Sequence, residues 1–208
     1  MTNFLTIDNF LDKKDMISLI NSINKSRVEG IQVFHNSIDK NLNIFESTLN
    51  KKFIKKLQKK YLPKAIEILR KINPKKLDLY DYSDFTLIIT NKNKKFPIHD
   101  DTPDKILSGV IYLYPQKNKG TIFYNNKKGD KKKIIKWKQN RAVFFSRIEK
   151  ESWHSYEGDG ISDRITLVFN LKTYNIKGVY KIENKSFIFG ILRWKLNPYI
   201  HRIFGKLI

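Results

Sequence analysis

Hydrophobic residues in the N-terminal part of the chain recur mainly at the spacing of an α-helix. Residues 10–23 carry an apolar stripe, and Asp8 stands where the N-cap of a helix is expected. A second stripe covers residues 49–72, and Pro63 is expected to interrupt it. The remaining short segments predict two strands and a polar loop, at 4–7, 30–34 and 36–46.

After Pro74 the hydrophobic period changes from that of a helix to that of a strand. Alternating segments are separated by short polar stretches rich in Asn, Gly and Pro. The expected strands lie at 77–82, 84–90, 106–114, 120–124, 133–138, 141–146 and 164–173. Many short strands after a helical part predict an α+β protein that is mainly β, a double-sheet jelly roll with the N-terminal helices packed on one sheet.

The length of 208 residues suits a single domain with a sizeable core. We expect this domain over residues 1–176, with a helical part at 1–74 and the jelly-roll core at 75–176. Residues 177–208 are expected to form a basic amphipathic C-terminal extension, which Pro198 should break in two. Such a segment packs on the core or on a second protein, or its apolar face at 186–208 lies on a membrane surface. The oligomeric state is left open.

Composition limits the kinds of site and compartment. Cysteine is absent, so disulfides and thiolate metal sites are excluded, and a metal has to be held by His, Asp or Glu. No apolar run reaches the roughly 18 residues of a membrane span, and the N-terminus lacks a secretory-signal pattern. These features predict a cytoplasmic protein.

The formal net charge of +21 raises nucleic acid as a partner. The excess is almost all lysine, spread along the whole chain. We therefore favour a compositional bias with a solvated basic surface over a nucleic-acid site.

Two histidines and one aspartate form the candidate metal-binding pattern. In the sequence His99-Asp100-Asp101, the side chains of His99 and Asp101 point the same way if the segment is extended. His154 lies 53 residues beyond Asp101 and can come from another strand of the barrel. Two imidazoles and one carboxylate are the ligands of the facial triad, which binds Fe(II) and leaves positions open for a 2-oxoacid and dioxygen. Asp100 and Asp104 are the alternatives to Asp101, but the first should point away and the second is expected at a turn.

Arg164 follows His154 by ten positions and belongs to an alternating strand. Arg164 and Thr166 share one face, and Ile165 and Leu167 share the other. An arginine that points into an apolar interior is costly without an anion. The far carboxylate of a dicarboxylate cosubstrate would supply this anion. The alternative is that Arg164 faces solvent or pairs with a structural acid.

The order of these residues resembles that of the 2-oxoglutarate- and Fe(II)-dependent dioxygenases, nearest the prolyl-hydroxylase-like group. The likeness covers residues 4–174 and rests on the segments 7–11, 99–101, 120–123, 140–145, His154 and 164–166. It implies a double-stranded β-helix core, and hydroxylation coupled to decarboxylation of 2-oxoglutarate to succinate and CO2. The implied cofactors are Fe(II), 2-oxoglutarate and O2, with ascorbate as a further candidate. The implied site consists of iron ligands His99, Asp101 and His154, of Arg164 on the C5 carboxylate of 2-oxoglutarate, and of Tyr112 and Thr166 as further contacts of that molecule.

The chain departs from one branch of this superfamily. Its nucleic-acid demethylases carry a second arginine six positions after the first, where this chain has Asn170. The resemblance therefore favours hydroxylation of a peptidyl residue, an amino acid or a small metabolite over nucleic-acid repair. The alternative from a different class is a non-catalytic basic jelly roll that binds nucleic acid or another polyanion.

Overall fold

The computed structural model describes residues 3–23 and 29–204. Its helices are α1 (Lys13–Asn21), α2 (Lys51–Ile72), α3 (Ile176–Ile182) and α4 (Phe187–Phe204), with one 3₁₀ helix, η1 (Pro74–Leu79). Its strands are β1 (Phe4–Ile7), β2 (Ile31–Phe34), β3 (Asn36–Asp39), β4 (Ile44–Ser47), β5 (Tyr82–Thr90), β6 (Lys95–His99), β7 (Lys105–Tyr114), β8 (Ile122–Phe123), β9 (Lys133–Ile134), β10 (Ala142–Phe145), β11 (His154–Glu157) and β12 (Arg164–Lys172).

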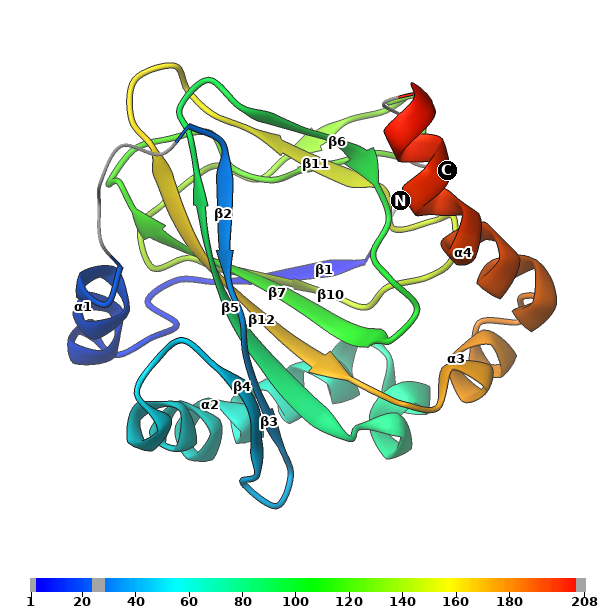
Figure 1. Ribbon diagram of the computed structural model, residues 1–208, viewed down its shortest axis with the longest axis horizontal. Coiled ribbons are helices and arrows are strands. Elements are labelled where there is room, and N and C mark those ends of the chain that lie inside the picture. Colours follow the sequence, from blue (N-terminus) through cyan, green and yellow to red (C-terminus); the bar gives the residue numbers. More distant parts are fainter. Residues whose placement is uncertain (1–2, 24–28, 205–208) are drawn as a thin grey trace.

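The strands form two antiparallel sheets. The larger has the order β1-β10-β7-β12-β5-β3-β4, with β2 also paired to β5, and the smaller has the order β6-β11-β8-β9. The smaller sheet lies over one face of the larger, and α1 and α2 lie on the opposite side (Figure 1). The predicted class, a mainly β protein with a jelly-roll core and N-terminal helices on one sheet, is confirmed.

The large sheet separates two apolar layers. On the helix side, Leu167 and Phe169 of β12 pack in one cluster with Leu57 of α2. On the inner side, Phe145 of β10 packs with Phe123 of β8 from the smaller sheet. The alternate residues Leu167 and Phe169 of β12 therefore both face the helix-side layer, as the alternation of the sequence predicts.

The polar segment at 36–46 is not a loop, because β3 and β4 form there. The buried amide of Asn36 donates to the carbonyl of Phe85 (2.9 Å) and accepts from the backbone N–H of Leu49 (2.8 Å). Ser37 pairs with Asp84 of β5. The N-terminal part thus contributes β1 to β4 to the large sheet in addition to its two helices.

The strand predicted at 77–82 is also wrong over most of its length. Residues 74–79 form η1, with Pro74 in the first turn, where its missing N–H costs nothing. The backbone N–H of Tyr80 donates to the carbonyl of Leu77 (3.2 Å), which is the spacing of a 3₁₀ turn.

Neither internal proline breaks its helix. Helix α2 continues through Pro63 and α4 through Pro198. In α2, a buried stripe that includes Tyr61 and Ala65 holds the helix against the sheet around the missing hydrogen bond. The N-cap of α1 is Asp12, not Asp8.

Helix α4 has one anchored side and one exposed side. Arg193 is buried, whereas Ile188, Phe189, Leu192 and Tyr199 are each more than half exposed. None of the described helices has the length and apolar character needed to cross a membrane. Contact of residues 186–208 with a membrane surface or another protein, the domain boundary at 176 and the oligomeric state stay predictions.

Candidate metal centre and cosubstrate cavity

The two histidines of the candidate triad face each other across the smaller sheet. His99 ends β6, His154 begins β11, and they are direct partners in the antiparallel register. Their ring centroids are 4.2 Å apart. Asp101 follows β6, and one ligand atom from each of the three residues lies within 4.8 Å of the others. The fold therefore gathers on one spot the three residues that the sequence separates.

Backbone carbonyls orient both imidazoles. Nδ1 of His99 is 3.0 Å from the carbonyl oxygen of Pro97, and Nδ1 of His154 is 2.9 Å from that of Ser152. Because a carbonyl only accepts, each Nδ1 carries a proton, and in the neutral ring Nε2 is then the nitrogen with the lone pair. This is the tautomer that a metal ligand through Nε2 requires.

The pKa values of His99 and Asp101 also suit a cation. Burial, reinforced by the nearby His154, lowers the pKa of His99 to about 3. Burial would raise the pKa of Asp101, but the charge of Lys105 and the two imidazoles outweigh it and hold that pKa well below its usual range. A neutral imidazole and an ionised carboxylate bind a metal without first releasing protons.

Two further residues contact the carboxylate of Asp101. Nζ of Lys105 donates to Oδ1 (2.6 Å), and Oγ of Ser108 donates to Oδ2 (2.5 Å). Neither residue belongs to a recognisable motif in the sequence. Their only local signal is a position four and seven residues after Asp101, where the chain enters β7. Both residues line the same cavity as the triad, and their two hydrogen bonds fix the rotamer of the Asp101 carboxylate.

The alternatives to Asp101 are engaged elsewhere. Asp100 is buried and binds Arg193 of α4. Asp104 pairs with Lys172 at 2.8 Å. Neither belongs to the His-Asp-His group, so the geometry selects Asp101 as the carboxylate beside the two imidazoles.

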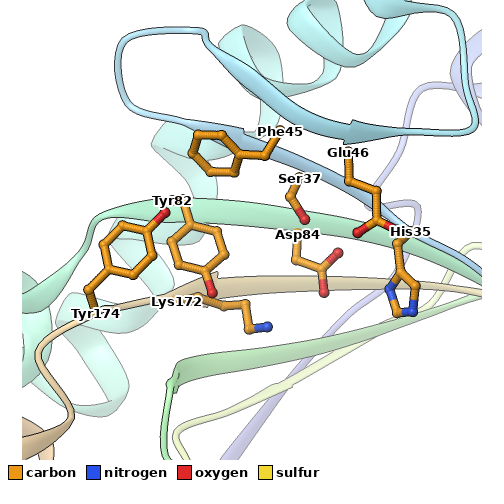
Figure 2. A pocket seen from close by; sticks show the side chains of 8 residues that line it. All are labelled: His35, Ser37, Phe45, Glu46, Tyr82, Asp84, Lys172 and Tyr174. Carbon is orange, nitrogen blue, oxygen red and sulfur yellow. The ribbon is translucent and has the colours of Figure 1, made fainter.

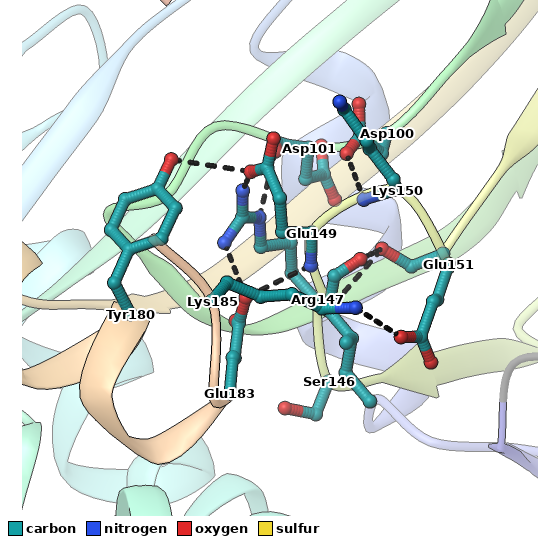
Figure 3. Close-up of polar contacts among 12 residues, drawn as sticks. Asp100, Asp101, Ser146, Arg147, Glu149, Lys150, Glu151, Tyr180, Glu183 and Lys185 are labelled. Atoms are coloured by element: carbon teal, nitrogen blue, oxygen red, sulfur yellow. Dashed lines mark hydrogen bonds and ion pairs between the residues drawn. The ribbon is translucent and has the colours of Figure 1, made fainter. Parts of the chain in front are cut away.

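A buried network of charges lies beside Asp101, and Figure 3 shows part of it. Three cations and three carboxylates alternate in it, namely Lys76, Glu183, Arg147, Glu149, Arg193 and Asp100. Arg147 also donates from Nε to the backbone carbonyl of Asp101 (3.2 Å). The network thus connects η1, α3 and α4 to the segment that carries two of the three candidate ligands.

Arg164 and Thr166 lie on the inner face of β12 and line the same cavity as the triad, which has a volume of about 260 Å³. Arg164 is 2% exposed. Its guanidinium lies over the rings of Tyr156 (4.5 Å) and Trp137 (5.2 Å). No described carboxylate pairs with it, and its Nε and Nη1 have no hydrogen-bond partner. Burial lowers the pKa of Arg164, although the guanidinium stays a cation.

Tyr112 lies deeper than the cavity wall. Its hydroxyl donates to Oγ1 of Thr121 (3.0 Å) and accepts from the backbone N–H of Thr121 (2.8 Å), and its ring stacks on Trp137. Thr121 itself lines the cavity. A direct contact of Tyr112 with 2-oxoglutarate therefore stays a prediction, and its observed contacts hold Thr121 and Trp137 in place.

Other acids and histidines near the site have different partners. The acids that flank His154 do not reach its Nδ1, because that atom bonds to Ser152; Glu149 instead binds Arg193. His35 is exposed and lines a separate groove. The side chain of His201 lies outside the described residues.

The residues present fit Fe(II) and 2-oxoglutarate. Two imidazoles and one carboxylate supply the donor set, and the guanidinium of Arg164, which has no described carboxylate as a partner, lacks only an anion. A buried cation without a counter-ion is costly, and an anion bound in the cavity would remove this cost.

No family model matches the chain, and no curated protein sequence matches it. Solved structures do. A Pseudomonas putida prolyl-4-hydroxylase aligns with a TM-score of 0.56 at 14% identity, over 84% of this chain and 95% of that one. A Burkholderia pseudomallei oxidoreductase of the 2OG-Fe(II) oxygenase family aligns with a TM-score of 0.60 at 13% identity, over 83% and 85%. A Bacillus thuringiensis protein called IDO aligns with a TM-score of 0.57 at 12% identity, over 83% and 93%. At these identities the likeness concerns the architecture: the chain has the fold of the 2-oxoglutarate- and Fe(II)-dependent oxygenases.

Proposed function

We propose that this protein is an Fe(II)- and 2-oxoglutarate-dependent dioxygenase that hydroxylates a C–H bond of its substrate. One observation carries the proposal: the unpaired, buried guanidinium of Arg164 shares a cavity with the His-Asp-His group. The metal-ligand pattern alone fits many reactions. An anion site beside it is what a dicarboxylate cosubstrate needs.

When bound together, iron, 2-oxoglutarate and O2 supply the oxidation, in which 2-oxoglutarate gives succinate and CO2 and one oxygen atom enters the substrate. His99 and His154 would hold the metal through Nε2, and Asp101 would add the negative charge. Arg164 binds the far carboxylate and so sets the orientation of the 2-oxoacid end toward the metal. Thr166 lies two residues along the same face and donates a second hydrogen bond.

Apolar walls complete the site. Phe145 and Val168 line the cavity, and Phe96 stacks on Tyr156 at 5.4 Å beside it. These side chains exclude water from the metal, which strengthens the electrostatic contacts of Arg164 and limits side reactions.

The test is anaerobic addition of Fe(II) and 2-oxoglutarate, followed by absorption spectroscopy. We expect a metal-to-ligand charge-transfer band in the native protein and none in His99→Ala. His35→Ala is the matched control, because it removes an imidazole outside the triad, and it should keep the band. Exposure to O2 should then yield succinate. A native protein that gives neither the band nor succinate refutes the proposal.

The alternative of a non-catalytic module for nucleic acid or another polyanion rests on the charge of +21. Binding of an oligonucleotide by such a module falls steeply with salt and does not depend on iron. Salt titration with and without Fe(II) therefore separates it from the dioxygenase.

A further inference from the structure

A second groove lies on the inner face of the large sheet, beyond the cavity that holds the triad. It has a volume of about 350 Å³. Tyr82 and Asp84 of β5 and Lys172 of β12 form its floor, and Phe45 and Glu46 of β4 reach over them (Figure 2). Alternate residues of β12 line the two sites: the cavity is lined by Arg164, Thr166, Val168 and Asn170, and the groove by Lys172. Both sites therefore lie on the same face of the sheet.

The strand register connects this groove to the metal centre. Ser37 is opposite Asp84, and Asp84 is opposite Asn170. The pairs Val168 with Val110 and Leu171 with Leu107 put Ser108 opposite Asn170. Directly opposed residues share a face. A polar row therefore crosses the sheet from the groove to Ser108, which donates to the carboxylate of Asp101.

The free hydrogen-bonding capacity along this row, within the part of the chain that the structure describes, is that of acceptors. Asn170 is 1% exposed, lines the cavity, and its Oδ1 has no hydrogen-bond partner. Asp84 is 6% exposed, and its Oδ1 accepts a hydrogen bond from the hydroxyl of Thr86 (2.6 Å). Among the described residues, no basic side chain forms an ion pair with Asp84 or with Glu46. A ligand that satisfies this row has to donate hydrogen bonds.

The negative charge of the groove is unusual for this protein. The chain has 41 basic and 20 acidic residues. Lys172 is the one lysine or arginine among the residues that line the groove, and its ammonium is paired with Asp104 at 2.8 Å. Two carboxylates, Asp84 and Glu46, therefore share the groove with one ammonium that is already paired. Although the charge of Lys172 also attracts Asp84, the excess of negative charge favours a cationic ligand.

Aromatic rings form the rest of the groove. Tyr82 stacks on Tyr174 with centroids 4.9 Å apart, and Phe45 meets Tyr82 edge to face. Phe45 and Tyr174 are 52% and 67% exposed, although apolar rings of this size are usually covered. Aromatic faces beside carboxylates are a common environment for amines and guanidinium groups.

We propose that this groove binds a cationic group, an amine or a guanidinium, that is carried by the substrate of the dioxygenase. This inference rests on the proposed function for its link to catalysis. Asp84 and Glu46 bind the charge, Tyr82 and Tyr174 pack against the adjoining carbons, and Oδ1 of Asn170 accepts an N–H on the way to the metal. Asp84 is two strand spacings from Ser108, or about 10 Å. Because Ser108 binds Asp101 and the metal would lie beyond it, the cation and the oxidised carbon are separated by at least about that distance, which fits a basic side chain on a peptide near the residue that is hydroxylated.

Binding of small probes tests the groove without knowledge of the substrate. We would add butylguanidinium or butylammonium to the full-length protein and follow backbone amide NMR shifts in β4 and β5. Butylurea, of similar shape but neutral, and butyrate, an anion, are the controls. We expect both cations to shift the amides around Glu46 and Asp84, and both controls to leave them unchanged. Equal shifts with butylurea, or no shift with either cation, overturn the proposal.

Substitutions locate the binding energy. Asp84→Asn should weaken butylguanidinium binding about tenfold, because a hydrogen bond to a charged group is lost. Glu46→Gln should weaken it as well, and because Glu46 is exposed this variant stays informative if Asp84→Asn fails to fold. Glu67→Gln, an exposed acid of α2, is the matched control and should bind like the native protein. Unchanged affinity in both groove variants contradicts the assignment.

The two proposals fail separately. Asp84→Asn should keep the anaerobic band with Fe(II) and 2-oxoglutarate, because Asp84 does not touch the triad. If the native protein forms the band but binds neither cation, only the assignment of the groove is contradicted. If the native protein binds both cations but forms no band, the proposed function is contradicted and the cation site is retained.

Discussion

Arg147 and Arg164 are buried to nearly the same depth, but their surroundings differ. Arg147 is fully buried beside Glu149 and Glu183, and it pairs with both. Arg164 is 2% exposed, with aromatic rings beside it and no described carboxylate. The first guanidinium has its counter-ions within the fold, whereas the second is left for a ligand. Burial alone therefore does not identify a functional arginine; the absence of a protein anion does.

The largest effect is expected from breaking the paired cluster. Arg147→Met leaves Glu149 and Glu183 buried with fewer cations and should lower the free energy of unfolding by about 3–5 kcal/mol. Urea denaturation measures the change. Arg70→Met is the matched control, because its pair with Glu67 is more than half exposed on both sides and is worth less than about 1 kcal/mol. A loss in Arg147→Met no larger than in this control would show that the cluster adds nothing to stability.

The unpaired arginine should respond in the opposite way. Arg164→Met removes a buried charge that has no protein partner, so the free energy of unfolding without ligand should be unchanged or higher. Affinity for 2-oxoglutarate should fall by about 2–3 kcal/mol, roughly a hundredfold, because a buried carboxylate loses its partner. Titration of the anaerobic band and urea denaturation give the two numbers. Destabilisation comparable to that of Arg147→Met would make Arg164 a structural residue.

A third cluster is paired but partly open to solvent, and its effect should be the smallest. Burial raises the pKa of Asp15, but hydrogen bonds from Lys56, Lys60 and Tyr61 outweigh this and lower it from 3.8 to about 2. Because the folded pKa is the lower one, the stabilisation is complete above pH 4 and is lost as the pH falls through about 2. Lys56 and Lys60 are 54% and 32% exposed, so screening reduces the contribution to ~1 kcal/mol.

Asp15→Asn tests this sign. Its deficit in unfolding free energy relative to the native protein should be ~1 kcal/mol larger at neutral pH than at a pH of about 2. Denaturation at both pH values measures the difference. A deficit that grows on acidification would contradict the direction of the pKa shift.

The sequence was informative where a period carries the signal. Alternation along β12 correctly placed Arg164 and Thr166 opposite Ile165 and Leu167, and it did so because one face of this strand packs on the helix-side core. The same reasoning failed for 36–46, since residues such as Ser37 are polar on the inner face, where they meet a groove instead of a core. The polar lining of the groove thus lacks the apolar alternation on which strand prediction relies.

Other features have no local signal. Neither β6 nor β11 is among the strands predicted from alternation, although they carry both histidines. Strand β6 is an edge strand that contains Pro97, and β11 (His154–Glu157) consists mostly of polar residues. The bond between Arg193 and Asp100 joins residues 93 positions apart. No local sequence pattern around Asp100 or Arg193 indicates that the two residues pair, so such contacts can be found only from the three-dimensional fold.

The contact between α4 and Asp100 has a consequence for the order of events during synthesis. All three proposed iron ligands are translated before Arg193, which comes 39 positions after His154. Until Arg193 joins the fold, Asp100 lies between two of these ligands without the cation that pairs with it. Burying it at that stage is unfavourable. We therefore expect the nascent chain to bind iron weakly, and the centre to become competent only after α4 has docked.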